Sequence, residues 1–435
     1  MTMERLNSFG TVTTRDIIGA ADAAGTPAYL YDEALIKQKC AELMATPSAY
    51  GLSVRFAMKA NSTRAILRLI AAQGLLFDAS SLNEARRAVL AGIDHSAIIL
   101  TTQEAYEGSE MLALEDMIAR GMKYNVCSLR QLHMIGNFAS ANGVKLAIRV
   151  HPGVGSGETA TRNTGDKYSC FGIHLTDVPK AIQYAKDKAI VFDHVHVHIG
   201  SGTDPALWRD NIDRELSFIE TYFPAATTVS FGGGLREARM PGEMAADIHD
   251  LGGYAKEKVE AFYKKTGRRL HTEIEPGTYV MANAGYALTT VVDVKRTGPD
   301  GLLFIVADGG MEINARPLLY GSHHPFYVVS KDGQLRSSEF AQVLPETEAV
   351  VVGTCCESGD SQCLNDRGEN VPRRIAVPEI SDFVVIGGVG AYCSSMTPMN
   401  YNSHTQIPEL LLGDGGQLTL IRKRQTLEQI LENEI

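Results

Sequence analysis

Several residues that could do chemistry occur at the ends of short apolar segments of this chain. They are Lys59, His198, Glu275 and the glycines at 232–234. An enclosed lysine amine can form a Schiff base with an aldehyde. A glutamate can hold the protonated nitrogen of an aromatic ring, and glycine N–H groups can approach a phosphate closely. A histidine can lie flat against the same ring. Together these types predict a site for a phosphorylated aromatic aldehyde that acts as an electron sink.

Further polar residues end other apolar segments or follow them closely. Asp78, Ser128 and Arg149 occupy such ends, and Ser201 follows His198 in His-Ile-Gly-Ser-Gly. The Ser201 hydroxyl could bind the same phosphate. Taken singly, a strand-end lysine is usually solvated, a glycine triplet is usually a flexible loop, and a glutamate before proline can cap a turn. The order of these residues along the chain carries the prediction.

The segments that must position these residues alternate with amphipathic helical windows. This pattern predicts a (β/α)8 barrel, in which reactive side chains collect at the carboxyl ends of the strands. An open, doubly wound parallel sheet is the alternative. The eight predicted strands cover residues 53–59, 75–79, 97–101, 123–128, 145–150, 194–199, 228–231 and 271–275.

The pattern changes after residue 276 to short β-rich segments separated by Gly, Pro and Asp turns, which predicts a mostly β domain. Residues 27–31 are also strand-like, and we expect them to join that domain. The predicted division is a barrel at 32–281 and a β-rich domain formed by 1–31 and 282–435. The β-rich segments are 286–294, 302–307, 325–330, 349–353, 383–386 and 417–421.

Composition narrows the class of protein. A formal net charge of −10 over 435 residues makes nucleic-acid binding an unexpected main function. The chain has no run of 18 apolar residues and no signal-like amino terminus, so we expect a cytoplasmic protein with no membrane contact. Seven cysteines without a Cys-x-x-Cys pair favour neither a disulfide framework nor a structural zinc site.

His194, His196 and His198 alternate along one predicted strand and therefore share one face. Such a row could bind zinc, which would favour a metal-dependent barrel hydrolase. It could equally be one functional histidine with two others packed in the barrel wall. Enzymes of the metal type usually add His or Asp ligands at other strand ends, whereas Lys, Gly and Glu occur there in this chain.

The chain resembles the fold-type III pyridoxal-phosphate decarboxylases, whose relatives include alanine racemase, and within them the diaminopimelate decarboxylases. The resemblance extends from residue 28 to residue 424. It rests on the segments Ala-Met-Lys-Ala-Asn at 57–61, His-Ile-Gly-Ser-Gly at 198–202, Gly-Gly-Gly at 232–234, Glu-Pro-Gly at 275–277, Cys-Glu-Ser-Gly-Asp at 356–360 and Gly-Ala-Tyr at 390–392.

The resemblance implies that pyridoxal 5′-phosphate is the cofactor. In that case Lys59 carries it, His198 stacks on it and Glu275 holds its ring nitrogen, with Asp78 and Arg149 in the same pocket. The implied phosphate site consists of Ser201, Gly232, Gly233, Gly234, Gly277 and Tyr392.

The resemblance also implies a homodimer with active sites shared between subunits. Cys356 of the partner subunit would then return a proton after CO2 loss, while the adjacent Cys355 is expected to be a buried structural cysteine. The expected reaction converts meso-diaminopimelate, a small amino acid, to L-lysine. The residues implied to hold the distal end of this substrate are Arg316, Tyr320, Glu357 and Tyr392.

Three positions depart from the family pattern by lacking an expected cation. Thr278 and Cys170 stand where arginine and lysine are usual, and His404 stands where Arg-Pro usually begins. The substrate is therefore altered, or another cation compensates, with Arg162 and Lys167 as candidates. A related decarboxylase acting on another amino acid or conjugate, in a natural-product or siderophore pathway, is the first alternative. A racemase is a second alternative, and it would need another base opposite the lysine.

Overall fold

The computed structural model describes residues 4–155, 164–200, 204–340 and 345–435. Contacts between Cα atoms divide the chain into two compact units. The first, called the barrel unit, comprises Lys39–Arg236 and Met244–Tyr279. The second, called the β-rich unit, comprises Met1–Gln38, Glu237–Glu243 and Val280–Ile435.

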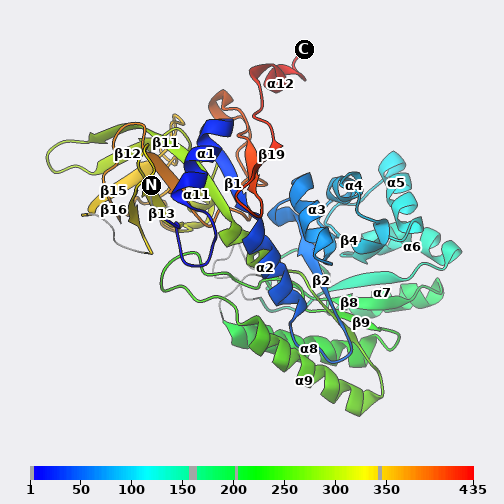
Figure 1. The fold of residues 1–435 in the computed structure, drawn as a ribbon. Coiled ribbons are helices and arrows are strands. Elements are labelled where there is room, and N and C mark those ends of the chain that lie inside the picture. Colours follow the sequence, from blue (N-terminus) through cyan, green and yellow to red (C-terminus); the bar gives the residue numbers. More distant parts are fainter. Residues whose placement is uncertain (1–3, 156–163, 201–203, 341–344) are drawn as a thin grey trace. The chain divides into compact units, whose positions relative to one another are not determined.

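Eight parallel strands form a closed ring in the barrel unit (Figure 1). The ring closes because β10 pairs with β2 and β5 pairs with β6. This closure confirms the predicted barrel and excludes the open sheet. In ring order the strands are β2 (Leu52–Ala57), β3 (Leu76–Ala79), β4 (Ile98–Thr101), β5 (Lys123–Val126), β6 (Leu146–His151), β8 (Phe192–His196), β9 (Thr228–Ser230) and β10 (His271–Ile274).

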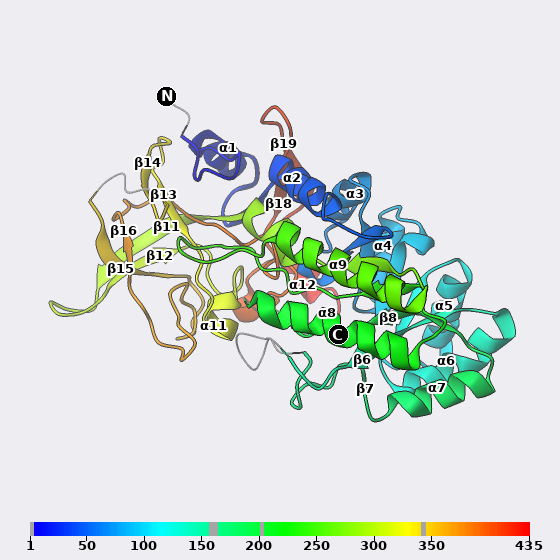
Figure 2. The ribbon, with the colours of Figure 1, turned by 90° about the horizontal axis from the view of Figure 1, so that it is seen from below.

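Helices connect the strands, and α8 and α9 lie side by side (Figure 2). Short polar residues begin them: Ser81 accepts a hydrogen bond from the backbone of Glu84, and Ser128 accepts one from Gln131. Ser128 is therefore a helix cap. The helices are α3 (Arg64–Ala72), α4 (Leu82–Leu90), α5 (Gly108–Ala119), α6 (Leu129–Asn142), α7 (Val178–Asp187), α8 (Pro205–Tyr222) and α9 (Ile248–Thr266), and a short strand, β7 (Ile173–His174), pairs with β6.

A buried ion pair joins the neighbouring strands β2 and β10. Arg55 donates to both carboxylate oxygens of Glu273, at 2.6 and 2.9 Å. Burial opposes ionisation of Glu273, but His194 and Arg55 outweigh it and lower its pKa to about 2. Burial lowers the pKa of His194 to about 4, so this imidazole is neutral at pH 7.

The β-rich unit contains a second sheet with the order β14-β13-β17-β11-β1-β18-β19, and β11 also pairs with β12. Strand β1 (Ala28–Asp32) pairs with β11 and β18, which confirms that residues 27–31 belong to this sheet. The other strands are β11 (Gly285–Arg296), β12 (Leu303–Ala307), β13 (Phe326–Val329), β14 (Leu335–Ser338), β15 (Thr347–Val352), β16 (Arg373–Ile375), β17 (Phe383–Ile386), β18 (Glu409–Leu412) and β19 (Leu418–Arg422).

Apolar side chains of this sheet form a core with α1 (Thr14–Ala24), including Ile17, Leu30, Leu288 and Leu410. Of the helices that the structure describes, none is long and apolar enough to cross a membrane. The remaining helices are α2 (Glu33–Met44), α10 (Thr278–Met281), α11 (Arg316–Tyr320) and α12 (Leu427–Leu431).

Candidate active site

Lys59 lies directly after β2, in a single 3-10 turn formed by Met58–Ala60. The backbone N–H of Ala57 donates to the carbonyl of Pro276 at 3.1 Å, which joins this strand end to the segment that follows β10. The lysine side chain is exposed, and its charge acts on the carboxyl of Asp78. Lys59 and Glu275 therefore occupy neighbouring strand ends of the barrel.

The carboxylate of Glu275 is fixed by two buried hydrogen bonds. Ser230 Oγ donates to Oε1 at 2.6 Å, and His196 Nε2 lies 3.0 Å from Oε2. Asn125 Nδ2 lies 3.1 Å from His196 Nδ1. An amide nitrogen only donates, so His196 Nδ1 must be the acceptor of this bond. His196 Nε2 therefore carries the hydrogen and donates the hydrogen bond that Glu275 accepts. Burial alone would raise the pKa of Glu275, but His196 and Ser230 hold it below its usual range.

Asp78, at the end of β3, is the second buried carboxyl group of this layer. Its Oδ1 atom has no hydrogen-bond partner among the described residues. Burial and the charge of Glu275 raise the pKa of Asp78 to about 8, against the opposing charge of Lys59. Two neighbouring buried carboxyls do not readily ionise together, so at pH 7 Glu275 is charged and Asp78 is protonated.

His198 follows β8 and accepts a hydrogen bond at Nδ1 from the backbone N–H of Gly233, 3.1 Å away. Desolvation lowers its pKa well below the ordinary histidine value, and the cations Lys59 and Arg149 lower it further. His198 is therefore neutral. Arg149, from β6, is buried, and its guanidinium lies 5.0 Å from the ring centre of Phe171.

The glycine triplet lies where side chains have no room. A Cβ atom on Gly232 would lie 2.6 Å from the carbonyl oxygen of Val197, and one on Gly233 would lie 2.4 Å from that of Glu275. Gly232 and Gly234 also adopt positive φ angles of 70° and 92°. Close packing against the ends of β8 and β10 therefore favours glycine at positions 232 and 233.

The remaining residues predicted for the phosphate include Gly277, which is buried just beyond Glu275. Ser201 lies outside the described residues, as does the candidate cation Arg162. The other candidate, Lys167, is exposed, and its amine lies 4.9 Å from the ring centre of Tyr168.

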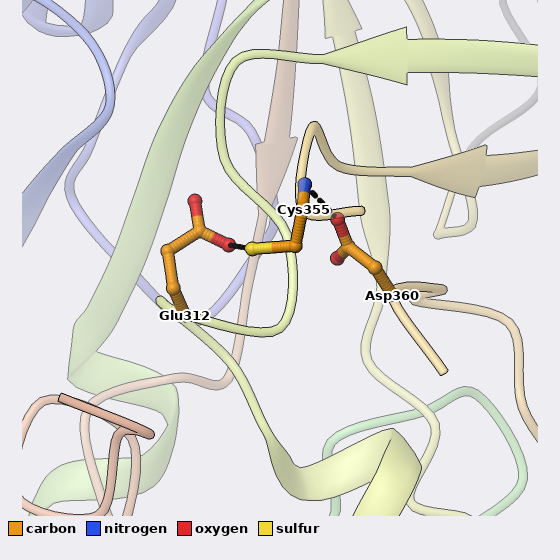
Figure 3. A group of neighbouring side chains, drawn as sticks. All are labelled: Glu312, Cys355 and Asp360. Atoms are coloured by element: carbon orange, nitrogen blue, oxygen red, sulfur yellow. Dashed lines mark hydrogen bonds between the residues drawn. The ribbon is translucent and has the colours of Figure 1, made fainter. Parts of the chain in front are cut away.

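The three alternating histidines lie against different groups and do not form a metal cluster. His194 faces Glu273 at 3.6 Å, His196 binds Glu275, and His198 binds a backbone N–H. Across the described ranges, the one group of three closely spaced metal-type donors is Glu312, Cys355 and Asp360, in the β-rich unit (Figure 3). The zinc-triad alternative is therefore not supported.

Cys356 and Glu357 lie together on one loop of the β-rich unit. Cys356 is exposed, and its backbone N–H donates to Asn402 Oδ1 at 2.8 Å. Glu357 accepts from the backbone N–H of Gly359 and from the Tyr401 hydroxyl, both at 3.3 Å. These hydrogen bonds lower the pKa of Glu357, so it is ionised at pH 7.

The neighbouring Cys355 is buried, as expected, and its thiol points toward Glu312 (Figure 3). Its thiol donates to Glu312 at 3.3 Å, and burial together with that carboxyl raises the pKa of the thiol. Asp360 accepts from the backbone N–H groups of Cys355, at 2.7 Å, and Met311, at 2.6 Å. Asp360 thus ties the loop to the preceding Gly-Gly-Met turn.

Arg316 begins α11 and is buried, with its guanidinium 5.5 Å from the ring centre of Tyr320. One terminal nitrogen donates to Ser322 Oγ at 3.4 Å, and Nε has no hydrogen-bond partner in the described part of the chain. Tyr392 is half-buried and adopts a left-handed φ of 58°. The residues predicted to hold the substrate therefore include a buried cation and an ionised carboxylate.

Some residues of the site were not predicted from the sequence. Ser230 was absent from the prediction, and His196 was interpreted only as a member of a metal row or of the barrel wall. The sequence nevertheless contained information about both residues, because residues two apart on one strand lie on the same face of that strand. His196 precedes His198 by two, and Ser230 precedes Gly232 by two. Thr278, at the start of α10, and His404 are half-buried, while Cys170 is exposed.

Comparison with known proteins gives consistent results. The family model described as "pyridoxal-dependent decarboxylase, pyridoxal binding domain" matches residues 34–282. The diaminopimelate decarboxylase of Escherichia coli K12 is 34% identical over 429 residues, which cover 98% of this chain and 97% of the relative. That of Streptomyces coelicolor is 30% identical, covering 99% and 94%.

Solved structures agree over the same length. A crystal structure of diaminopimelate decarboxylase matches with a TM-score of 0.89 and 31% identity, covering 99% of both chains. The Helicobacter pylori diaminopimelate decarboxylase, complexed with L-lysine, matches with a TM-score of 0.79 and 27% identity, covering 96% of this chain and 98% of that one.

Proposed function

This chain belongs to the pyridoxal-dependent decarboxylases, and we propose that it releases CO2 from meso-diaminopimelate to give L-lysine. The main structural support for this reaction is the buried, ionised carboxylate of Glu275, which accepts hydrogen bonds from Ser230 and His196. A carboxylate fixed in this way can keep a ring nitrogen protonated. The substrate follows from relatives that bear this activity in their names and align over nearly the whole chain.

The residues of the barrel unit fit pyridoxal 5′-phosphate. Bound there, this cofactor supplies a cationic ring that takes up the electron pair left by a departing carboxylate. Lys59 would bind the aldehyde of the cofactor, and Glu275 would bind its ring nitrogen. The neutral imidazole of His198 would stack on the face of the ring. The glycine triplet, whose backbone is not shielded by side chains of its own, would bind the phosphate. The proposed cofactor residues are completed by Asp78, Arg149, Ser201, Gly232, Gly233, Gly234, Gly277 and Tyr392.

Cys356 would supply the proton that replaces the lost carboxylate. Its thiol is exposed, and the bond from its backbone to Asn402 fixes the loop that carries it. CO2 leaves, its bonding electrons stay on the substrate carbon, and the proton of Sγ forms the new C–H bond. We propose that this thiol enters the site of the partner subunit in a homodimer.

The other end of the substrate carries an ammonium and a second carboxylate. The ionised Glu357 suits the ammonium, and the planar guanidinium of Arg316 suits the carboxylate. Tyr320 and Tyr392 complete the proposed substrate site. An enzyme with this product would work in the cytoplasm, where amino acids are made.

The direct test is CO2 and amine release by the cofactor-loaded protein from meso-diaminopimelate, beside lysine, ornithine, arginine and glutamate. We expect lysine to form from diaminopimelate, and the visible absorbance of the cofactor to disappear in Lys59→Ala. A coloured protein that ignores diaminopimelate would overturn the proposed substrate while keeping the cofactor.

Shared sites can be tested by mixing two inactive variants. Lys59→Ala and Cys356→Ala, each inactive alone, should regain about a quarter of wild-type activity after subunit exchange at equal amounts. Half of the random dimers would be mixed, and each would hold one intact site. No recovery between subunits proven to exchange would show that each site is built from one chain.

One observation favours a second candidate, a related decarboxylase with a different amino-acid substrate. Thr278 lies at the start of α10, at the position where the family resemblance led us to expect an arginine. If specificity has drifted here, Thr278→Arg should raise kcat/KM for diaminopimelate. An unchanged or lower value would show that threonine suits the present substrate.

A further inference from the structure

Asn125 is a buried polar side chain of the barrel strand β5. It is 0% exposed, and in the parallel pairing of β4 with β5 it lies opposite Thr101. Burying an amide costs free energy unless its polar groups are hydrogen-bonded, so apolar residues are the more usual content of such a position. The partners of this amide therefore indicate what the residue does.

Both hydrogens of the Asn125 amide have an acceptor. Nδ2 donates to Thr101 Oγ1 at 3.2 Å and lies 3.1 Å from His196 Nδ1. The carbonyl oxygen Oδ1 has no hydrogen-bond partner among the described residues. In the reverse orientation of the amide, two N–H donors would occupy that unpartnered place, which costs more than one unpartnered oxygen. The orientation that engages both N–H groups is therefore favoured.

The bond from Asn125 determines where His196 carries its own hydrogen. With Nδ1 accepting, only Nε2 can carry a hydrogen, and Nε2 lies 3.0 Å from Glu275 Oε2. The same bond opposes a second hydrogen on the ring, because a hydrogen on Nδ1 would meet that of the amide. His196 is therefore a neutral donor to Glu275 and not an imidazolium.

The neutral state of His196 affects the charge that Glu275 can offer. An imidazolium at this distance would compensate the carboxylate, whereas a neutral imidazole only donates a hydrogen bond to it. The other hydrogen bond to Glu275 also comes from a neutral group, the Ser230 hydroxyl, at 2.6 Å. Two neutral donors thus fix the carboxylate and leave its negative charge for a cation. In the proposed site that cation is the protonated ring nitrogen of the cofactor.

The neighbouring histidines of the same row lie against other groups. His194 Nε2 lies 3.6 Å from Glu273, and His198 Nδ1 accepts from the backbone N–H of Gly233 at 3.1 Å. His196 is therefore the imidazole of this row that donates a hydrogen bond to Glu275, and its state depends on the residue that faces Nδ1.

We propose that Asn125 is a positioning residue of the active site, which keeps His196 neutral and so leaves the charge of Glu275 to the ring nitrogen of the cofactor. The inference rests on the proposed function. Asparagine suits this task because its amide nitrogen only donates, whereas an ionised aspartate of the same shape only accepts. Asn125→Asp would therefore attract a hydrogen to Nδ1 and make His196 an imidazolium between two carboxylates.

Pyridoxal 5′-phosphate and its 1-deaza analogue make a matched pair of probes, because they differ at one ring position. The analogue has a C–H group in place of the ring nitrogen and offers Glu275 no cation. Spectroscopic titration of the cofactor-free protein would give both dissociation constants for the wild type, Asn125→Asp and Asn125→Leu. The matched controls are Asn211→Asp and Asn211→Leu, because Asn211, on α8, belongs to the same unit and is also buried.

We expect the wild type to bind the natural cofactor about tenfold or more tightly than the analogue, which leaves a buried carboxylate facing a C–H group. Asn125→Asp should reduce this ratio to about threefold or less, because an imidazolium then compensates Glu275. Asn125→Leu should give an intermediate ratio, since leucine neither donates to Nδ1 nor attracts a hydrogen there. Both changes at Asn211 should leave the ratio unchanged, even where they weaken the binding of both forms.

Turnover of meso-diaminopimelate by the cofactor-loaded variants adds a second measurement. In Asn125→Asp, kcat should fall about tenfold or more while KM changes less than about threefold. The reason is that the charge on the ring nitrogen matters most while the substrate carbon holds the electron pair of the departing carboxylate. A residue that only supports the fold would not separate the two constants in this way.

Equal losses for both cofactor forms in Asn125→Asp would show that Asn125 only supports the fold, and would overturn the inference. A wild type that binds the two forms equally well would overturn it too. Should Asn125→Asp not fold, Asn125→Leu decides, and an unchanged ratio there would refute the role of Asn125. If the wild type shows the preference and Asn125→Asp loses it, but diaminopimelate is not decarboxylated, the proposed reaction fails and the role of Asn125 stands.

Discussion

Replacing Asp78 by asparagine should remove a pH dependence from the stability of the cofactor-free protein. Asp78 is 4% exposed, and burial with the nearby charge of Glu275 raises its pKa to about 8 from the ordinary 3.8. Between these two values the folded protein keeps a proton that the unfolded chain has released. The stability that this proton provides is complete below about pH 4 and is lost as pH rises toward 8.

The size of the effect follows from one proton released on unfolding. The free energy of unfolding then falls by about 1.4 kcal/mol per pH unit, or about 2.7 kcal/mol between pH 5 and pH 7. Asparagine has nearly the same shape and does not titrate. The difference in stability between the wild type and Asp78→Asn should therefore change by this amount across the interval.

Urea unfolding at pH 5, 6 and 7, followed by circular dichroism, would measure the difference. Asp187→Asn is the control, since Asp187 is an exposed carboxylate near the end of α7. Its stability should follow the wild type at every pH. Parallel curves for the wild type and Asp78→Asn would refute the assignment of the proton to Asp78.

Three further changes have defined outcomes. Gly233→Ala would place a Cβ 2.4 Å from a backbone carbonyl oxygen, so cofactor affinity should fall about tenfold or more. Absorbance titration would measure this affinity. Gly253→Ala is the control and should not alter the affinity, because a Cβ there would have nothing within 4 Å. Arg55→Met leaves the buried Glu273 without its bidentate partner and should cost about 3–5 kcal/mol in urea unfolding, with Arg55→Met/Glu273→Met more stable than the single variant. Asn402→Ala removes the 2.8 Å hydrogen bond that fixes the loop carrying the proposed proton donor, and should lower kcat about three- to tenfold with unchanged cofactor absorbance.

The sequence predicted the barrel because its strands are set by local pattern. Eight apolar segments separated by amphipathic helices have few ways to bury their apolar faces, and a closed ring is one of them. The predicted strands match β2, β3, β4, β5, β6, β8, β9 and β10 within a few residues. The types of the candidate site residues could also be predicted, since these residues occur where those strands end. Their roles in catalysis and binding stay predictions.

Three strands of the β-rich unit were not predicted, namely β14, β16 and β18. They are three or four residues long, and β16 (Arg373–Ile375) is largely charged. Strands this short take their stability from partners distant in sequence, as β18 does from β1. Local pattern does not contain that information.

Residue order alone determined that a lysine, a histidine and a glutamate would follow strands of one barrel, and parallel strands in a barrel bring their carboxyl ends to one rim. Only the tertiary structure decided which carboxyl is charged, since burial, the bonds from Ser230 and His196, and the proximity of Asp78 to Glu275 set that balance. It also placed the segment Glu237–Glu243 in the β-rich unit, where Arg239 Nε donates to the carbonyl of Gly388. Electrostatic energy depends on distance and solvent exposure, and both exist only once the chain has folded.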